Sequence, residues 1–224
     1  MDLIAELLAL VAPPVCAACR DPLRDPRGSL CAGCLARLPW LKDACSRCGL
    51  PEHRRRCPAA ASALVRTWAP LAYEGVARDL MRSLKFRGQL RLAGPMGAQM
   101  AANLPRDLRR AGATVVAVPA HSGRRRRRGH DPAGALAAQV ASRTGMPAAR
   151  CLERIDAAPG QIGAGRAERL TGGRLAVRAR GAVPARVLLV DDVHTTGATL
   201  ETCARALRGA GAEWVAGVAY ARTL

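Results

Sequence analysis

The clearest hydrophobic pattern in the chain is the apolar run Val187–Val190, directly followed by the two acids Asp191 and Asp192. A short uninterrupted apolar run is typical of a strand that is buried on both faces of a parallel sheet. A turn of small residues comes next, and apolar residues then recur at helical spacing, at Leu200, Cys203, Ala204 and Leu207. The pattern therefore predicts a strand, an acidic pair where that strand leaves the core, a small turn and a helix.

Similar patterns predict strands and helices on both sides of this segment. Further strands are expected at Val65–Tyr73 (interrupted by Pro70), Thr114–Val118, Leu175–Val177 and Trp214–Tyr220. Helices are expected at Leu3–Val11, at Gly75–Phe86, up to Asn103 with a break or restart at Pro95, and from Pro132 to Gly145 with Asp131 as its N-cap. Strands that alternate with helices predict an α/β fold, with a parallel sheet flanked by helices.

A change in composition near residue 58 divides the chain. Seven of the nine cysteines lie between Cys16 and Cys57, and the other two, Cys151 and Cys203, stand alone in the later part of the chain. We therefore expect a small cysteine-rich module over residues 1–58 and the α/β domain over residues 59–224.

The cysteine spacing indicates structural zinc. Each C-x2-C pair presents two thiolates to one tetrahedral ion, and two pairs complete its shell. The simplest sequential pairing gives a first site from Cys16, Cys19, Cys31 and Cys34, and a second from Cys45, Cys48, His53 and Cys57. A crossed pairing of the knuckles fits the spacing as well, and Arg54, Arg55 and Arg56 beside His53 disfavour a cation there. Disulfides are the alternative, but they fit poorly with the cytoplasmic location expected below.

The turn after the acidic pair has the chemistry of a sugar-phosphate site. Its hydroxyls, its free backbone N–H groups and the positive end of the following helix suit a phosphate dianion. The candidate phosphate loop is Thr195, Thr196, Gly197, Ala198 and Thr199. The carboxylates of Asp191 and Asp192 can accept hydrogen bonds from sugar hydroxyls or place a magnesium ion. His194 is expected to point away from the phosphate and to have no part in the site.

Three further segments carry candidate anion contacts. The run Arg124–Arg128 falls in a strand-to-helix loop at the carboxyl edge of the sheet, where one or two arginines could hold a pyrophosphate and the others remain solvated. Lys85, Arg124 and Arg128 are the candidate pyrophosphate residues, although the helix dipole alone would favour a cation at Lys85. The glycine-rich segment 159–173 reads equally as a surface loop or as a mobile lid, with Gln161, Arg166 and Arg169 as candidate lid residues.

Composition adds a strong positive charge, for which there are two explanations. The formal net charge is +18, and almost all basic residues are arginine. Both an anionic partner and arginine-rich codon usage account for this excess. Aromatic residues make up 3% of the chain, which argues against an aromatic-stacking surface for single-stranded nucleic acid. No segment is long and apolar enough to span a membrane, and none resembles a signal peptide. A cytoplasmic location is therefore expected.

Taken together, these motifs resemble the ComF/GntX family, whose members pair a double zinc ribbon with a type I phosphoribosyltransferase domain. The resemblance covers almost the full length. It rests on the cysteine pairs, Leu84-Lys85-Phe86 with Gly88, Val118-Pro119, Arg128-Gly129, Gln161 with Gly163 and Arg169, the segment Val187–Leu200, and Ala221-Arg222.

The resemblance implies a ligand and roles for the candidate residues. It makes Asp191 and Asp192 the ribose and magnesium partners of phosphoribosyl pyrophosphate, and Thr195–Thr199 its 5′-phosphate loop. It also places the pyrophosphate loop at Pro119–Arg128. Transfer to or from a nucleobase-type acceptor is the implied activity. The alternative is a non-catalytic accessory protein that binds single-stranded DNA during competence and DNA uptake.

The chain departs from the family pattern at two places, and one of them is the missing fourth cysteine of the second ribbon. Where the family usually has RGFNQ, this sequence reads Arg128-Gly129-His130-Asp131-Pro132. The substitution removes two polar side chains near the expected pyrophosphate and adds a carboxylate. This departure affects the prediction of turnover more than that of phosphate binding, and the sequence assigns neither a general base nor an oligomeric state.

Overall fold

The computed structural model describes residues 14–25, 28–42, 44–53, 56–121, 123, 129–155 and 176–224. Its centre is a parallel sheet in the order β1-β8-β7-β3-β4, with β2 also paired to β8. The strands are β1 (Arg66–Trp68), β2 (Leu71–Ala72), β3 (Thr114–Ala117), β4 (Ala148–Ala149), β7 (Arg186–His194) and β8 (Trp214–Arg222). The predicted parallel sheet is therefore confirmed.

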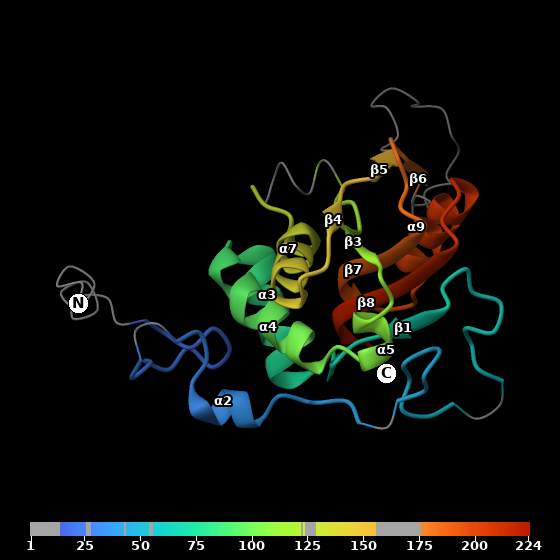
Figure 1. Ribbon diagram of the computed structural model, residues 1–224. Helices are drawn as coiled ribbons and strands as arrows, with labels where there is room; N and C mark the ends of the chain where they lie inside the picture. The colour runs from blue at the N-terminus through green and yellow to red at the C-terminus, as the bar shows by residue number, and fades with distance from the viewer. Residues whose placement is uncertain are drawn as a thin grey trace, which may run out of the picture.

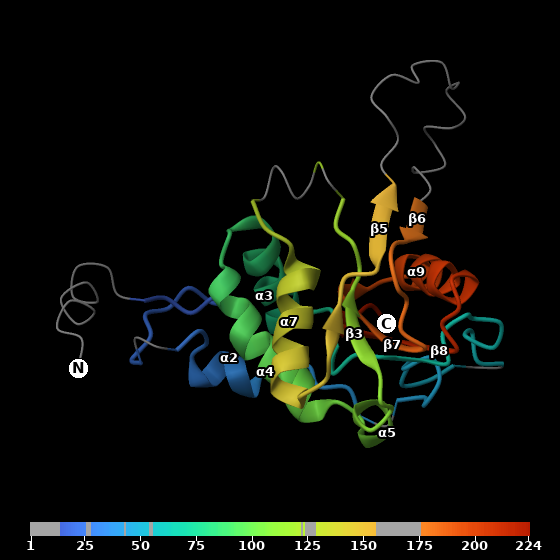
Figure 2. The ribbon, with the colours of Figure 1, turned by 45° about the horizontal axis from the view of Figure 1, so that its top comes forward.

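Helices cover both faces of this sheet. Figures 1 and 2 show α3 (Gly75–Phe86), α4 (Ala93–Asn103) and α7 (Pro132–Thr144) on one side, and α9 (Ala198–Gly209) on the other. The central strand β7 alternates between the two layers, because Leu188 and Val190 pack with the first group of helices and Val187 and Leu189 pack with α9. Burial on both faces explains the uninterrupted apolar run that the sequence shows here.

The remaining elements are short. They are α2 (Ala32–Ala36), the 3-10 turn η1 (Leu90–Leu92), α5 (Arg106–Arg109), and the antiparallel pair β5 (Leu152–Ile155) and β6 (Ala176–Ala179). Among the residues described, no helix is both long and apolar enough to cross a membrane.

Most predicted elements are confirmed, with shifted ends. The helix Gly75–Phe86 is present, and α7 has its predicted Asp131 N-cap, with Gly145 in the left-handed conformation at its end. Pro95 neither breaks nor restarts a helix, because it lies in the first turn of α4, where proline is tolerated. The strand expected at Val65–Tyr73 is divided into β1 and β2 around Pro70.

The expected end of the central strand is wrong. Asp191 and Asp192 do not follow the strand but lie within it, because β7 remains paired with β8 as far as His194 and Arg222. The helix α9 starts at Ala198, so Ala198 and Thr199 belong to its first turn rather than to the preceding loop. The acidic pair is therefore held within β7 by the pairing of this strand with β8.

The two zinc-ribbon segments pack against opposite ends of the α/β part (Figure 1). In the first, Cys16, Ala17 and Cys34 join the same hydrophobic cluster as Leu80 and Leu84 of α3. The second lies beside β1, where the Thr67 hydroxyl donates to the carbonyl of Cys48 at 2.8 Å. The domain boundary at residue 58 stays a prediction, and both segments contact the domain that follows it.

Candidate functional site

The cysteines gather into the two groups that sequential pairing predicts. Within each group the ligand atoms lie within 4.8 Å of one another, and the groups are Cys16, Cys19, Cys31 and Cys34, and Cys45, Cys48, His53 and Cys57. The crossed pairing is therefore not the one adopted, and all nine cysteines are free of disulfide bonds. Arg54 and Arg55 lie outside the described residues, and Arg56 is exposed.

The first group has the geometry of a zinc centre. The sulfur atoms of Cys19 and Cys31 are 3.7 Å apart, close to the spacing of about 3.8 Å that a tetrahedral shell with Zn–S bonds of about 2.3 Å requires. Backbone N–H groups point at the sulfurs, with Cys31 N donating to Cys16 Sγ and Cys34 N to Cys31 Sγ, both at 3.4 Å. Cys31 also caps α2, so the local fold orients its thiolate.

The second group is similarly prepared for a metal. The backbone N–H groups of Cys48 and Arg47 lower the pKa of the Cys45 thiol to about 6, which favours the thiolate that zinc binds. His53 approaches the same sulfur. Three cysteines and one histidine complete a closed four-ligand shell, so both centres fit structural zinc.

The acidic pair lies at the carboxyl edge of the parallel sheet. The backbone N–H of Asp192 donates to Asp191 Oδ1 at 2.7 Å, and Lys85 at the end of α3 forms an ion pair with Asp192 at 2.8 Å. Burial and the neighbouring Asp192 charge raise the pKa of Asp191 to about 7. One carboxylate is therefore neutralised by a lysine, and the other remains poised for protonation near neutral pH.

The predicted phosphate loop forms the start of α9. Gly197 is the N-cap and has a positive φ of 78°, a conformation that glycine adopts without strain. The backbone N–H of Ala198 donates to Thr196 Oγ1 at 3.4 Å. Beneath this turn lies the imidazole of His194, since a Cβ added at Gly197 would meet His194 Nε2 at 2.8 Å. The His194 ring therefore packs against the turn, but His194 is not among the residues that line the cavity at this edge of the sheet, so its expected absence from the site stays a prediction.

One cavity of about 390 Å³ brings most of these groups together. Its walls come from the carboxyl ends of several strands and from α3 and α7, and they include Tyr73, Lys85, Phe86, Pro119, His121, His130, Asp131, Arg154, Asp191, Asp192, Thr195 and Thr199. A larger cavity of about 890 Å³ shares Pro119, His130, Asp131 and Arg154 with it and extends over β4 and β5. Acids, hydroxyls and a lysine thus converge on one hollow, where open α/β sheets bind ligands.

The altered segment His130-Asp131-Pro132 has a structural explanation. The Asp131 carboxylate accepts from Gly134 N at 3.0 Å and caps α7, which Pro132 begins. The buried His130 ring contacts the carbonyl of Leu84 through Nε2 at 2.8 Å, directly before Lys85. The segment therefore ties α7 to the end of α3, while Asp131 still faces the cavity.

Sequence reasoning missed several residues of the cavity, and others cannot be placed. Arg154 of β5, Tyr73 after β2 and the exposed Phe86 (67%) all line it. Arg154 lies in a short strand without a clear apolar pattern. Phe86 belongs to the motif Leu84-Lys85-Phe86, which is the one sequence signal for it. Several predictions fall outside the described residues, namely the N-terminal helix Leu3–Val11 and the candidate residues Arg124, Arg128, Gln161, Arg166 and Arg169.

Comparison with known proteins identifies the class of the N-terminal domain. The family model of the double zinc ribbon domain matches residues 7–62. This match and the two ligand groups confirm the predicted zinc-ribbon module. A search of curated proteins finds no similar sequence.

Solved structures then give partial matches to this chain. A glutamine phosphoribosylpyrophosphate amidotransferase from B. subtilis is 27% identical over 64% of this chain and 26% of that chain, with a TM-score of 0.36. A purine phosphoribosyltransferase from Pyrococcus horikoshii Ot3 is 17% identical over 55% and 70%, with a TM-score of 0.37. An orotate phosphoribosyltransferase from Aeropyrum pernix is 21% identical over 63% and 61%, with a TM-score of 0.35. This chain spans only 26% of the amidotransferase.

Proposed function

We propose that this protein binds phosphoribosyl pyrophosphate together with magnesium and acts as a phosphoribosyltransferase. The observation that carries the proposal is the single cavity of about 390 Å³ that Lys85, the Asp191–Asp192 pair, Thr195 and Thr199 share. Each of these residues has a chemistry that one part of the ligand needs.

The 5′-phosphate belongs at the start of α9 in this proposal. The loop combines the threonine hydroxyls with free N–H groups at the positive end of a 12-residue helix, and Gly197 leaves the backbone unobstructed. Asp191 and Asp192 are separated from the loop by two residues and line the same cavity, so they are assigned to the hydroxyls of the ribose whose phosphate binds there. Carboxylate oxygens are also the ligands that magnesium prefers, so the pair fits either role.

Lys85 belongs at the pyrophosphate end of the ligand. Its ammonium group neutralises Asp192 at 2.8 Å, and a pyrophosphate in the same cavity would compete for it. In the proposed reaction, a nucleobase nitrogen forms a bond to the anomeric carbon while the C–O bond to pyrophosphate breaks. The electron pair leaves with the pyrophosphate, and the proton of that nitrogen is released to solvent. Such a step depends on charge neutralisation of the leaving group, so no general base is assigned. Magnesium supplies further neutralisation of that leaving group.

The test is calorimetric titration of phosphoribosyl pyrophosphate with and without magnesium, using the wild type and an Asp191→Asn/Asp192→Asn double variant. We expect magnesium-dependent binding to the wild type and a loss of at least about a hundredfold in the double variant. A matched control, Asp107→Asn/Glu213→Gln, removes two acids that do not line the cavity and should bind like the wild type. Unchanged binding by the Asp191→Asn/Asp192→Asn variant, with an intact fold by circular dichroism, contradicts the proposal.

Turnover needs a separate assay. Pyrophosphate release measured against a panel of nucleobases should identify the acceptor, and it should disappear in the double variant. Binding to single-stranded DNA that survives in this variant and weakens steeply with salt would instead support the accessory-protein alternative.

A further inference from the structure

A buried arginine lies between the second zinc centre and the candidate phosphate loop. Arg222 ends β8, and only 4% of its surface is exposed. Its Nη1 group donates a hydrogen bond to the carbonyl of Cys48, a ligand of the second centre. In the strand register Arg222 pairs with His194, the last residue of β7. The Arg222 side chain thus contacts the zinc knuckle. Its partner in the strand register, His194, packs against the loop at Gly197.

The charge of Arg222 needs a counter-charge at this position. A buried guanidinium is costly unless an anion compensates it. Within the described parts of the chain, no carboxylate forms an ion pair with Arg222. Zinc bound by three thiolates and a neutral histidine leaves one net negative charge on the shell, which is the compensation that Arg222 lacks elsewhere.

The knuckle is seated closely against this arginine. Gly49 follows Cys48 with a φ of 69°, and an added Cβ would lie 2.8 Å from the carbonyl oxygen of Thr67 and 3.0 Å from Arg222 Nη1. The Thr67 hydroxyl donates to the same Cys48 carbonyl at 2.8 Å. The position of the Cys48–Gly49 peptide is therefore fixed by β1 on one side and by Arg222 on the other.

The opposite end of this chain of contacts is the loop itself. The backbone N–H of Thr223 donates to the His194 carbonyl at 3.0 Å, which fixes the ends of β7 and β8 to each other. Burial, and then the Arg222 charge, lower the pKa of His194 to about 4, so its ring is neutral. The Nε2 atom of that ring lies 2.8 Å from the position that a Gly197 Cβ would take. Because the ends of β7 and β8 are bonded to each other, a shift at Arg222 would also move the His194 ring beneath the turn.

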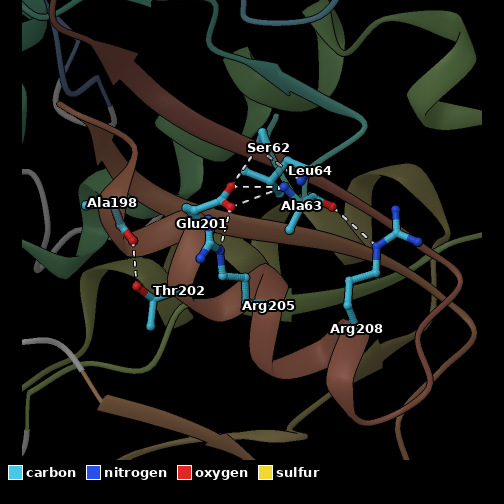
Figure 3. A network of polar contacts seen from close by, with 8 residues as sticks. All are labelled: Ser62, Ala63, Leu64, Ala198, Glu201, Thr202, Arg205 and Arg208. Carbon is cyan, nitrogen blue, oxygen red and sulfur yellow. Dashed lines mark hydrogen bonds and ion pairs between the residues drawn. The ribbon is translucent and has the colours of Figure 1, made fainter. Parts of the chain in front are cut away.

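A second connection reaches the first turn of α9 from the same ribbon. Glu201 accepts hydrogen bonds from the Ser62 hydroxyl at 2.6 Å and from Ala63 N at 3.2 Å, as Figure 3 shows. Arg47, between Cys45 and Cys48, donates to the carbonyls of Ala59 and Ala60, each at 3.0 Å. The helix that carries the loop is thus also bonded to the segment that leaves the second ribbon.

We infer that Arg222 is a positioning residue, through which the second zinc knuckle sets the geometry of the phosphate loop at Gly197. This inference rests on the proposed function, because the loop matters only if it holds a phosphate. It does not extend to the first ribbon, whose contacts lead to α3.

The test compares two ligands that use different parts of the cavity. Ribose 5-phosphate depends on the loop, whereas magnesium pyrophosphate depends on the Lys85 end. Calorimetry should show that Arg222→Met weakens ribose 5-phosphate about tenfold, as expected for one misaligned phosphate hydrogen bond, with pyrophosphate affinity nearly unchanged. Arg222→Lys keeps the charge and should recover part of the loss. The matched control is Arg186→Met, an exposed residue at the opposite end of β7 from the loop, whose guanidinium contacts the Trp214 ring and the Ala111 carbonyl.

Each result separates this inference from the proposed function. A wild type that binds neither ligand overturns the proposed function itself. A wild type that binds both, with Arg222→Met equal to the wild type, overturns the positioning role alone, as does an equal loss of both ligands. If Arg222→Met fails to fold, Gly49→Ala serves instead, because its Cβ pushes the knuckle away from Thr67 and Arg222 without replacing any zinc ligand. Equal affinities in Gly49→Ala and the wild type would then refute the inference.

Discussion

The two zinc ribbons are alike in sequence pattern and differ in how they are attached. The first is held mainly by apolar packing, with Cys16, Ala17 and Cys34 in one cluster with α3. Its polar link, from Ser83 Oγ to the Ala17 carbonyl at 2.9 Å, also leads to α3. The second is attached through polar groups, because its Cys48 carbonyl accepts from both Thr67 and Arg222.

This difference predicts different consequences when each ribbon is disturbed. Apolar burial is non-directional, so the first ribbon stabilises the domain without fixing particular atoms. Hydrogen bonds are directional, and those of the second ribbon end one strand away from the phosphate loop. We therefore expect the first ribbon to determine stability and the second to determine ligand affinity.

Removal of one zinc ligand from each ribbon should have the largest effects. Cys34→Ser should lose the first zinc and lower the Tm by about 10 °C or more, because Cys34 belongs to the main core and structural zinc contributes on the order of 10 kcal/mol to folding. Cys57→Ser should lose the second zinc with a smaller decrease in Tm and a larger loss of ribose 5-phosphate affinity. Zinc content, thermal unfolding and calorimetry measure the three quantities. Identical profiles in the two variants would refute the comparison.

Gly197→Ala should disturb the loop without touching either ribbon. The alanine Cβ would meet the His194 ring at 2.8 Å, and a φ of 78° costs a non-glycine residue about 1 kcal/mol. We expect at least a tenfold loss of ribose 5-phosphate affinity, since small misplacements of binding groups are costly. Gly209→Ala at the end of the same helix has no neighbour within 4 Å and is the control. Adding His194→Ala should restore part of the lost affinity, and wild-type binding by Gly197→Ala would exclude close support by His194.

A pH series separates the acidic pair from both ribbons. The pKa of Asp191 is raised to about 7 from its ordinary 3.8, so its protonated form stabilises the fold below pH 3.8 and this stability is lost as the pH rises through 7. Asp191→Asn should therefore be more stable than the wild type at pH 8, by up to about 4 kcal/mol, and the difference should shrink toward pH 5. Comparing variant with wild type cancels the pH dependence of the zinc ligands. A difference that grows toward pH 5 has the wrong sign for this account.

The smallest expected effects come from two matched hydroxyl groups. Ser83→Ala and Thr67→Val each remove one hydroxyl-to-carbonyl hydrogen bond to a ribbon, and each should cost about 1 kcal/mol in unfolding free energy. Only Thr67→Val should weaken ribose 5-phosphate, by about two- to threefold. Equal effects on affinity, measured by calorimetry beside chemical denaturation, would mean that the ribbons are not distinguished by their attachment.

Local signals allowed much of the fold to be predicted from the sequence. The start and end of α7 were predictable because Asp131, Pro132 and Gly145 act on their own helix ends. The end of β7 was not predictable in this way, since its pairing with β8 as far as His194 depends on residues that are distant in the sequence. The two-residue strand β4 exists only through its pairing with β3 and has no pattern of its own.

The same distinction between local signals and long-range contacts applies to the candidate site. Asp191, Asp192 and the threonines were recognisable because one short segment contains them all. The support by His194 and the contact of Arg222 with Cys48 join residues far apart in the chain, and only the packed structure brings them together. For the contact of Arg222 with Cys48, the one available sequence signal was an arginine at the end of a strand that is otherwise apolar and buried.

The most direct test of the central claim is the titration of phosphoribosyl pyrophosphate into the zinc-loaded wild type, with and without magnesium. The account predicts one binding site per chain, with affinity that depends on magnesium. The absence of binding heat under both conditions, in protein that unfolds cooperatively and contains its zinc, would contradict it.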